Sequence, residues 1–251
     1  MTKAKIIIRE CTSIEELSGC VALQREVFSL PDLEISPVRH LIVTENAGGF
    51  TLGAFTAENR LVGFVLSVPA FFEDERFFYS HMTAVSAEFQ SHGIGTQLKW
   101  AQREKALSKN VKFIKWTFQP VQARNAFFNL EKLGAVVREY KPNFYGTDYS
   151  TSNTQGEKIG LDSDRLFAEW SLESEKVKKL AKGEKVVETG DIKQTIEIPN
   201  DWNALLKSDA KFAKSEQTRI KNEFQKAFAA KLICRSFERD RRSPKYLLFN
   251  V

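Results

Sequence analysis

The stretch Gln90-Ser91-His92-Gly93-Ile94-Gly95 decides the fold that we expect, because it places two glycines between a strand and a helix. Residues 77–85 are aromatic and apolar, which is typical of a strand, and residues 96–107 have the composition of a helix. The first N–H groups of a helix lack partners within the helix, and glycine lets a pyrophosphate approach them closely. The stretch therefore predicts a phosphate-bearing ligand, with an ordinary helix start as the alternative.

The spacing of these glycines separates three nucleotide-binding motifs. A Walker loop needs the pattern G-x-x-x-x-G-K-[ST], which the sequence lacks. A Rossmann fingerprint needs a third small residue where this chain has Gln97 or Leu98, and it belongs to the first strand and helix of a βαβ unit. The pattern that remains is Q-x-x-G-x-G after a strand that ends in Ala84-Val85.

Length and composition indicate a globular protein. Its 251 residues are 42% hydrophobic and 12% aromatic, which is enough for one large core and a smaller one. No apolar run approaches the ~20 residues of a membrane helix and no secretion signal is visible, so we expect a cytoplasmic protein without membrane contact. Cys11, Cys20 and Cys234 form no C-x-x-C pair, so we expect buried free thiols and no metal site.

The basic charge of the chain is concentrated in its C-terminal part. Residues 173–251 carry 18 basic and 12 acidic side chains, whereas residues 1–172 carry 19 and 20. Both signs are mixed in the basic part and few aromatic residues lie among them. We therefore expect a solvated surface there and no nucleic-acid partner.

Apolar periodicity predicts alternating strands and helices along residues 5–172. Strands are expected at residues 5–11, 49–55, 61–68, 77–85, 113–118, 135–140 and 164–172. Helices are expected at 14–28, about 36–45, 96–108 and 122–133. Thr12 or Ser13 would cap the first helix, and Gly134 would close the last.

The remaining residues predict a separate small unit. Residues 173–191 are charged with little apolar pattern, which indicates a linker or an exposed helix. From residue 195 onward the order is β-α-α-β-β, with Asn200 as the cap of the first helix. This order repeats that of residues 5–68, which predicts a degenerate half-repeat that pairs with the first sheet or with a partner subunit of a homodimer.

The loop, the element order and a second turn together resemble the GNAT (Gcn5-related N-acetyltransferase) superfamily. The turn Glu131-Lys132-Leu133-Gly134-Ala135 stands where the family has a lysine-leucine-glycine turn. A subgroup of predicted acetyltransferases of unassigned substrate is similar in further motifs: Ser80-His81-Met82, Trp116-Thr117-Phe118, Asn125-Ala126, Asn143-Phe144-Tyr145-Gly146 and Asp164-Arg165-Leu166. The resemblance implies an α/β fold with a mixed central sheet flanked by helices. Residues 1–172 would form the acyl-CoA-binding domain, residues 173–191 would be a charged linker, and residues 192–251 would form the small C-terminal α/β unit.

The same resemblance implies how acetyl-CoA, or another short acyl-CoA, would be held. Backbone groups of the central strand would bind the pantetheine arm and polarise the thioester, and the amides of the glycine turn would bind the pyrophosphate. No metal is implied. The cofactor-binding residues would be Thr83, Ala84, Val85, Gln90, Ser91, His92, Gly93, Ile94, Gly95, Thr96 and Asn125. For Asn125, a helix cap is the alternative.

The general base departs from the family pattern. Some family members have a catalytic glutamate on the strand before the loop, and Tyr79 stands at that position here. Strand alternation places Tyr79, His81 and Thr83 on one face. His81, with an ordinary pKa of about 6.5, is the candidate base, and a structural histidine is the alternative. His40 gives no signal.

The general acid departs from the family pattern as well. Leu130 occupies the place of the usual tyrosine, so Tyr145 is the candidate acid, and Gln119 replaces an aspartate of the subgroup. The expected activity is direct transfer of an acyl group from CoA to the amine of a small molecule. The alternative is a CoA-binding or acyl-CoA-sensing module that has lost turnover.

Overall fold

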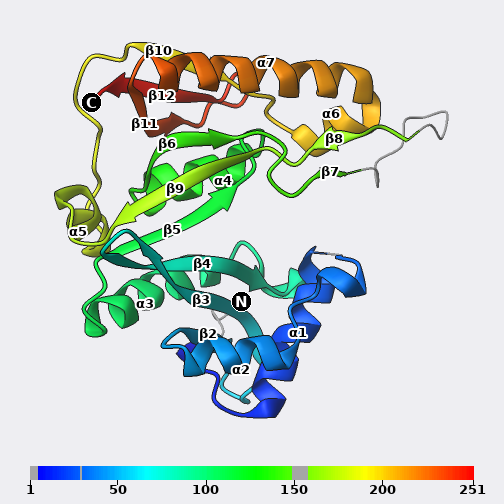
Figure 1. Ribbon diagram of the computed structural model, residues 1–251, viewed down its shortest axis with the longest axis vertical. Helices are drawn as coiled ribbons and strands as arrows, with labels where there is room; N and C mark the ends of the chain where they lie inside the picture. The colour runs from blue at the N-terminus through cyan, green and yellow to red at the C-terminus, as the bar shows by residue number, and fades with distance from the viewer. Residues whose placement is uncertain (1–4, 29, 149–157) are drawn as a thin grey trace. The chain divides into compact units, whose positions relative to one another are not determined.

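The computed structural model describes residues 5–28, 30–148 and 158–251. The chain divides into two compact units (Figure 1). Unit 1 runs to Lys115 and includes Ser171–Glu173, and unit 2 contains Trp116–Trp170 and Ser174–Val251. The sequence predicts other boundaries, with a domain that ends at residue 172 and a linker that ends at residue 191. These domain boundaries stay a prediction. None of the described helices is long and apolar enough to cross a bilayer.

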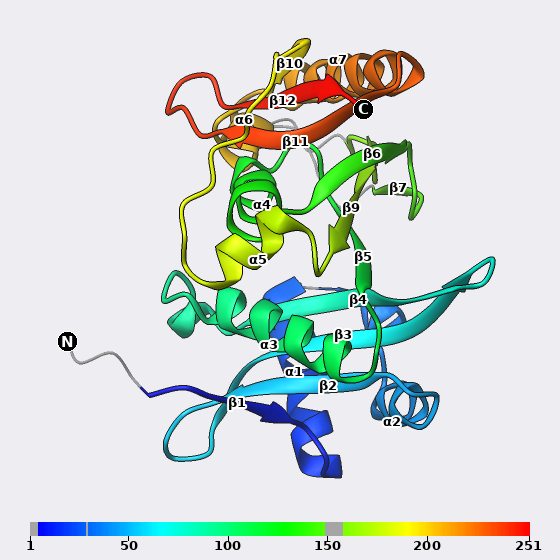
Figure 2. The same ribbon diagram turned by 90° about the vertical axis from the view of Figure 1, so that its left-hand side faces the viewer.

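Unit 1 is a sheet with helices on both faces (Figure 2). Its strands follow the order β1-β2-β3-β4-β5; β1 to β4 pair antiparallel, and β4 pairs parallel with β5. Helices α1 and α2 pack on one face, and α3 packs on the other. The elements are β1 (Ile7–Glu10), α1 (Ile14–Phe28), the 3-10 turn η1 (Asp32–Glu34), α2 (Val38–Asn46), β2 (Phe50–Phe55), β3 (Leu61–Phe72), β4 (Glu75–Val85), the 3-10 turn η2 (Ala87–Phe89), α3 (Ile94–Ser108) and the beginning of β5 (Phe113–Phe118).

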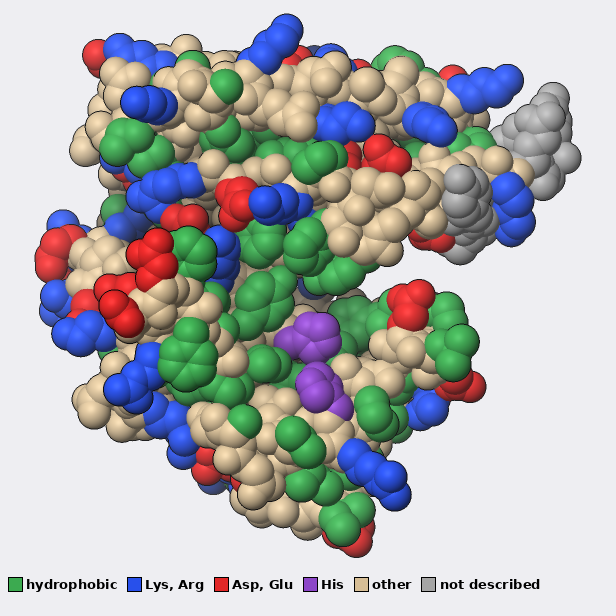
Figure 3. Space-filling view, in the orientation of Figure 1, with side chains coloured by type: hydrophobic (Ala, Val, Ile, Leu, Met, Phe, Trp, Pro, Cys, Tyr) green, Lys and Arg blue, Asp and Glu red, His purple; other side chains and the backbone are tan. Residues whose placement is uncertain are grey.

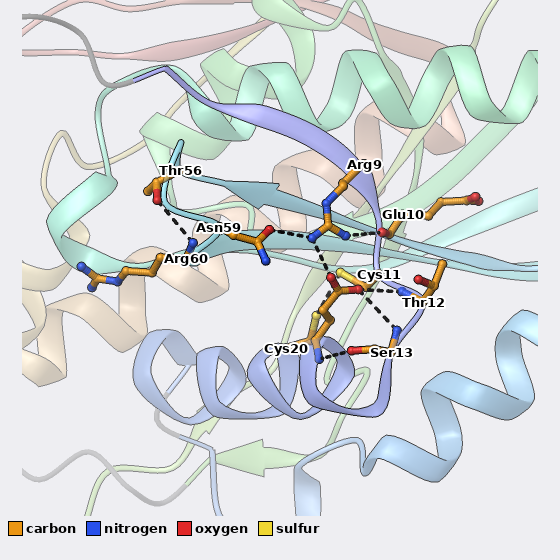
Figure 4. Close-up of polar contacts among 10 residues, drawn as sticks. Arg9, Glu10, Cys11, Thr12, Ser13, Cys20, Thr56, Asn59 and Arg60 are labelled. Atoms are coloured by element: carbon orange, nitrogen blue, oxygen red, sulfur yellow. Dashed lines mark hydrogen bonds and ion pairs between the residues drawn. The ribbon is translucent and has the colours of Figure 1, made fainter.

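Helix α1 starts with a reciprocal cap, drawn in Figure 4. The Ser13 hydroxyl accepts a hydrogen bond from the Glu16 amide at 3.2 Å, and the Glu16 carboxylate accepts from the amides of Thr12 and Ser13. These bonds satisfy N–H groups that the helix leaves open. Arg9 of β1 pairs with the same carboxylate at 2.6 Å and lowers the pKa of Glu16 to about 2. The cap predicted at Thr12 or Ser13 is thus Ser13.

The core of unit 1 lies between the sheet and the helices α1 and α2. Leu17, Leu41, Phe64 and Leu66 are among its buried side chains. Burial of such side chains contributes about 1.5–3 kcal/mol each, which offsets the entropy lost on ordering the chain. All three cysteines are buried and free, as the sequence predicts.

Unit 2 contains a second set of strands, in the order β5-β9-β6-β11-β12-β10, together with a separate pair formed by β7 and β8. Strand β11 pairs antiparallel with β6 at Cys234 and Val137, so the C-terminal strands extend the sheet of the preceding segment. The elements are the end of β5, α4 (Ala123–Phe127), the π-helical turn η3 (Phe128–Lys132), β6 (Val136–Lys141), β7 (Thr147–Asp148), β8 (Leu161–Asp162), β9 (Arg165–Ser171), α5 (Glu175–Ala181), β10 (Gln194–Glu197), α6 (Trp202–Ser208), α7 (Ala210–Ala229), β11 (Leu232–Glu238) and β12 (Lys245–Asn250).

The C-terminal segment has the predicted order β-α-α-β-β, but it is no half-repeat of residues 5–68. In unit 1 the first strand of the pattern pairs with the second, β1 with β2. In the C-terminal segment the first strand pairs with the third, β10 with β12. The two segments therefore have different topologies. The expected cap is also wrong by one residue, because Asp201, not Asn200, accepts the amide of Ala204 at 2.9 Å.

Candidate active site

The glycine turn of unit 1 presents open backbone at the start of α3. Gly93 is the residue before the helix and has a left-handed conformation with φ of 81°. In the described part of the chain, no side chain caps this helix start. A Cβ placed on Gly93 or Gly95 would meet no described atom within 4 Å. The amides of the first turn therefore border open space, and a methyl group there would occupy it.

The turn is tied to the end of the preceding strand. The Gln90 side-chain amide donates to the backbone oxygen of Val85 at 3.0 Å, so the two ends of the connection stay together. Ser91 has a positive φ of 66°, an uncommon conformation that often accompanies function. Almost all residues expected to bind acyl-CoA follow one continuous path in unit 1: Thr83, Ala84 and Val85 end β4, Gln90 to Gly93 form the turn, and Ile94, Gly95 and Thr96 begin α3.

Strand β4 carries an extra residue where it faces β3. Ser67 lies opposite Ser80 and Leu66 lies opposite Met82, so His81 between them has no counterpart in the register. Such a bulge increases the local twist and re-aims neighbouring side chains.

The other edge of β4 loses its partner at the same place. Its register with β5 comprises the pairs Phe78 with Ile114 and Tyr79 with Lys115, and it includes no described residue beyond them. Within the described residues of unit 1, backbone groups on that edge of residues 80–85 therefore have no strand partner. An open edge of this kind can pair with an extended ligand.

Because of the bulge, the side chains of β4 do not alternate strictly between the two faces of the sheet. Met82 packs against the core cluster of α1 and α2, and the ring of His81 faces His40 of α2 with centroids 6.3 Å apart. Two consecutive residues thus lie on one face. Thr83 consequently turns to the α3 face. Sequence alternation predicts that Thr83 shares one face with Tyr79 and His81, and the bulge makes this prediction wrong for Thr83.

Histidine side chains gather on the surface of the molecule in Figure 3. The His81 side chain is open to solvent on one side, yet the surrounding protein desolvates its ring and lowers its pKa. The neighbouring His40 lowers this pKa further, because two cationic rings would repel each other. His81 is therefore neutral at neutral pH, the form that a general base needs. Sequence reasoning missed His40, since nothing along the chain indicates that α2 brings it to β4.

Unit 2 holds the other two candidates, Asn125 and Tyr145. Asn125 is exposed in α4 and is not the cap, because that position belongs to Gln122. The Tyr145 side chain is 59% exposed, and its hydroxyl lies 3.4 Å from the Thr117 hydroxyl. The Arg165 guanidinium lies over the Tyr145 ring, 5.0 Å from its centroid. These contacts bring the phenol to the end of β5.

The position of the missing family tyrosine is part of the core of unit 2. The helix predicted at 122–133 consists of α4 and a π-helical turn, with the Leu133 amide bonded to the Phe128 oxygen. Leu130 in this turn is fully buried, and its neighbour Asn129 accepts a hydrogen bond from the Trp116 indole at 3.2 Å. The turn therefore places an apolar side chain in the interior where the family has an acid. Across the described residues, no group of three or more His, Cys, Asp or Glu side chains could hold a metal ion.

Comparison with known proteins agrees with this architecture. Residues 17–135 match the family model described as the acetyltransferase (GNAT) family. A chain in the crystal structure of the NatC complex bound to Gag peptide and CoA is 16% identical with a TM-score of 0.52, and the alignment covers 67% of this chain and 99% of that chain. Arabidopsis thaliana Naa50 in complex with the bisubstrate analogue CoA-Ac-MVNAL is 16% identical with a TM-score of 0.50, covering 66% and 98%. Among curated proteins, none matches this chain.

The predicted fold class, a mixed α/β sheet flanked by helices, is confirmed. The match of residues 17–135 to the GNAT family model confirms the resemblance found in the sequence. As an enzyme it is accordingly a GNAT-type N-acetyltransferase, with acetyl-CoA or another acyl-CoA as co-substrate.

Proposed function

We propose that this protein transfers a short acyl group, in the first place acetyl, from acyl-CoA to the amine of a small molecule. The observation that carries the proposal is the continuous path in unit 1 from the open edge of β4 to the open amides of the glycine turn. An extended ligand can pair with the strand edge while its phosphates bind the helix start.

In this proposal each part of acyl-CoA meets a group suited to it. The amides of residues 90–96 hold the pyrophosphate, and the space beside Gly93 and Gly95 fits it because no side chain fills that space. The backbone of residues 83–85 binds the pantetheine arm. Strand N–H groups near the thioester stabilise the negative charge that develops on its carbonyl oxygen.

The proposed chemistry is a single displacement. His81, directly or through one water, takes a proton from the acceptor ammonium, whose free pKa lies far above neutrality. The amine nitrogen then forms a bond with the carbonyl carbon, and the carbon–sulfur bond breaks. The departing thiolate takes a proton from Tyr145 or from solvent. Tyr79 stays a candidate through its position beside His81 on the same face.

Thiol release tests this proposal. Purified protein is mixed with acetyl-CoA and a panel of amines, and free CoA is followed. The panel includes polyamines, amino acids and short peptides, because the NatC and Naa50 structures hold peptide-type ligands. Turnover with a small amine supports the proposal, and turnover with peptides alone overturns the small-molecule acceptor. In His81→Ala, loss of turnover with retained CoA affinity supports the base, and unchanged turnover removes it.

A second candidate function is a CoA-binding or acyl-CoA-sensing module. The buried Leu130 favours it, since the family acid is absent from the place where it would act. Calorimetry separates the two functions. Tight binding of acetyl-CoA without release of CoA across amine and acyl-donor panels favours the sensor, and absence of binding contradicts both.

A further inference from the structure

Four buried polar side chains meet beneath the bulge of β4. Ser67 comes from β3, Ser80 from β4, and Lys99 and Gln102 from α3. The Gln102 side-chain amide donates to the Ser67 hydroxyl at 2.8 Å and to the Ser80 hydroxyl at 3.0 Å. Lys99 donates to the same Ser80 hydroxyl at 3.0 Å. One helix is thereby bonded to two neighbouring strands of unit 1.

The hydrogen-bonding capacity of this cluster is fully used at its centre. A serine hydroxyl offers one donor and two acceptor sites. Ser80 accepts from Lys99 and Gln102, and its hydroxyl reaches the Gln102 side-chain oxygen at 3.2 Å. Both N–H groups of the Gln102 amide have acceptors. A buried network that is satisfied in this way is rigid and specifies one arrangement of the elements that it joins.

The network lies at the place where the pairing of β4 with both neighbouring strands changes. Ser67 and Ser80 are the register pair directly before the bulge, and Ser80 is the first residue of β4 beyond the pairs with β5. Gln102 thus joins β3 to β4 at the point where the bulge begins and the free edge opens. Burying Lys99 in this place carries an energetic cost, since desolvation lowers its pKa well below the ordinary value.

We propose that Gln102, acting through Ser67 and Ser80, is a positioning residue that holds the bulge of β4 in the form that receives the acyl group. This inference rests on the proposed function. Five residues separate Ser80 from the end of β4, which is about 17 Å of extended strand, and the glycine turn lies beyond it. The network therefore acts far from the pyrophosphate, at the acyl end of an extended ligand.

The test compares the dissociation constants of CoA and acetyl-CoA in the wild type and in Gln102→Met, measured by calorimetry. Methionine has a similar length but cannot donate to either serine. In the wild type we expect acetyl-CoA to bind more tightly than CoA. In Gln102→Met we expect the Kd of acetyl-CoA to rise about tenfold, the effect of losing roughly one hydrogen bond, and the Kd of CoA to stay within about twofold.

Gln24→Met is the matched control. Gln24 is a fully buried glutamine of α1, which lies on the face of the sheet opposite to α3, and it exchanges two hydrogen bonds with the backbone of Ser36. We expect it to lower the melting temperature and to leave the ratio of the two Kd values unchanged. Ser67→Ala, which removes only the acceptor on β3, decides the question if Gln102→Met does not fold, with the same expected loss of acetyl-CoA preference.

Three outcomes would overturn the inference. In the first, the wild type binds CoA and acetyl-CoA equally, so that the bulge recognises no acyl group. In the second, the Gln102 or Ser67 variant keeps the wild-type ratio, and in the third it weakens both ligands equally. If the wild type binds neither ligand, the proposed function fails first and this inference with it, which is a distinguishable result.

Discussion

The substitution Gly93→Ala tests the glycine turn through the conformation of one residue. Gly93 has a φ of 81°, which costs an L-residue about 1–2 kcal/mol relative to glycine. A Cβ at this position meets no described atom within 4 Å, so steric clash adds nothing to that cost. We therefore expect a loss of unfolding free energy of about 1–2 kcal/mol. For a protein of this length that lowers the melting temperature by roughly 2–8 °C.

The same substitution should weaken CoA binding by more than the folding cost. If the backbone relieves the strain by moving away from the left-handed region, the amides at the start of α3 turn away from the pyrophosphate. Loss of one hydrogen bond to a charged group costs about 1.5–3 kcal/mol, which corresponds to a rise in the Kd of CoA of roughly 10- to 150-fold. Calorimetric titration with CoA measures this change.

Gly48 serves as the control for CoA binding, and Gly95 serves as a comparison for stability alone. Gly48 follows α2 with a φ of 95° and equally open surroundings, so Gly48→Ala should cost similar stability without changing the Kd. Gly95 lies inside α3 with open surroundings, so Gly95→Ala should raise stability by about 0.5–1 kcal/mol. If Gly93→Ala loses as much stability as Gly48→Ala but binds CoA like the wild type, the turn does not hold the pyrophosphate.

Three further predictions concern single side chains. Arg9 lowers the pKa of Glu16 below its unfolded value, so this carboxylate stabilises the fold above about pH 5 and loses that effect as the pH falls toward 2. Glu16→Gln should therefore cost up to about 1 kcal/mol at pH 7 in urea unfolding, because solvent partly screens this half-buried pair, and nothing near pH 2. His40→Asn should raise the pKa of His81 by removing a cationic neighbour, moving its NMR titration and the acid limb of kcat/KM to higher pH; an unmoved titration contradicts this. Tyr246→Phe removes a hydroxyl that donates to a buried backbone oxygen at 2.7 Å, and thermal melts should show a loss of about 1–3 kcal/mol.

Many elements of the fold could be predicted because their signals are local. The capping pattern of Ser13 and Glu16 and the end of the helical turn at Gly134, where φ is 74°, depend on residues a few positions apart. The helix predicted at 122–133 was less accurate, since the hydrogen bonds of a π-helical turn span one residue more than those of an α-helix and a single such turn leaves no distinct apolar period. The half-repeat was wrong because element order does not specify which strands pair.

In the candidate site, the conformation of the glycine turn could be predicted from the sequence, whereas the surroundings of His81 could not. The turn around Gly93 is encoded by glycine itself, since the left-handed conformation and the open helix start follow from the absence of a side chain. The contact between His40 and His81 spans 41 positions of sequence and exists only because α2 packs on the sheet beside β4. The bulge at His81 is likewise a property of the register between two strands.

The sequence by itself determined the α/β class, the glycine turn at the start of α3 and the similarity to GNAT acetyltransferases, because glycine conformation, apolar periodicity and motif spacing act over short stretches of chain. The tertiary structure alone decided which face His81 takes, which histidine stands beside it, and that Gln102 joins Ser67 to Ser80 beneath it. These features depend on register and packing between elements that are distant in sequence, and no local pattern carries that information.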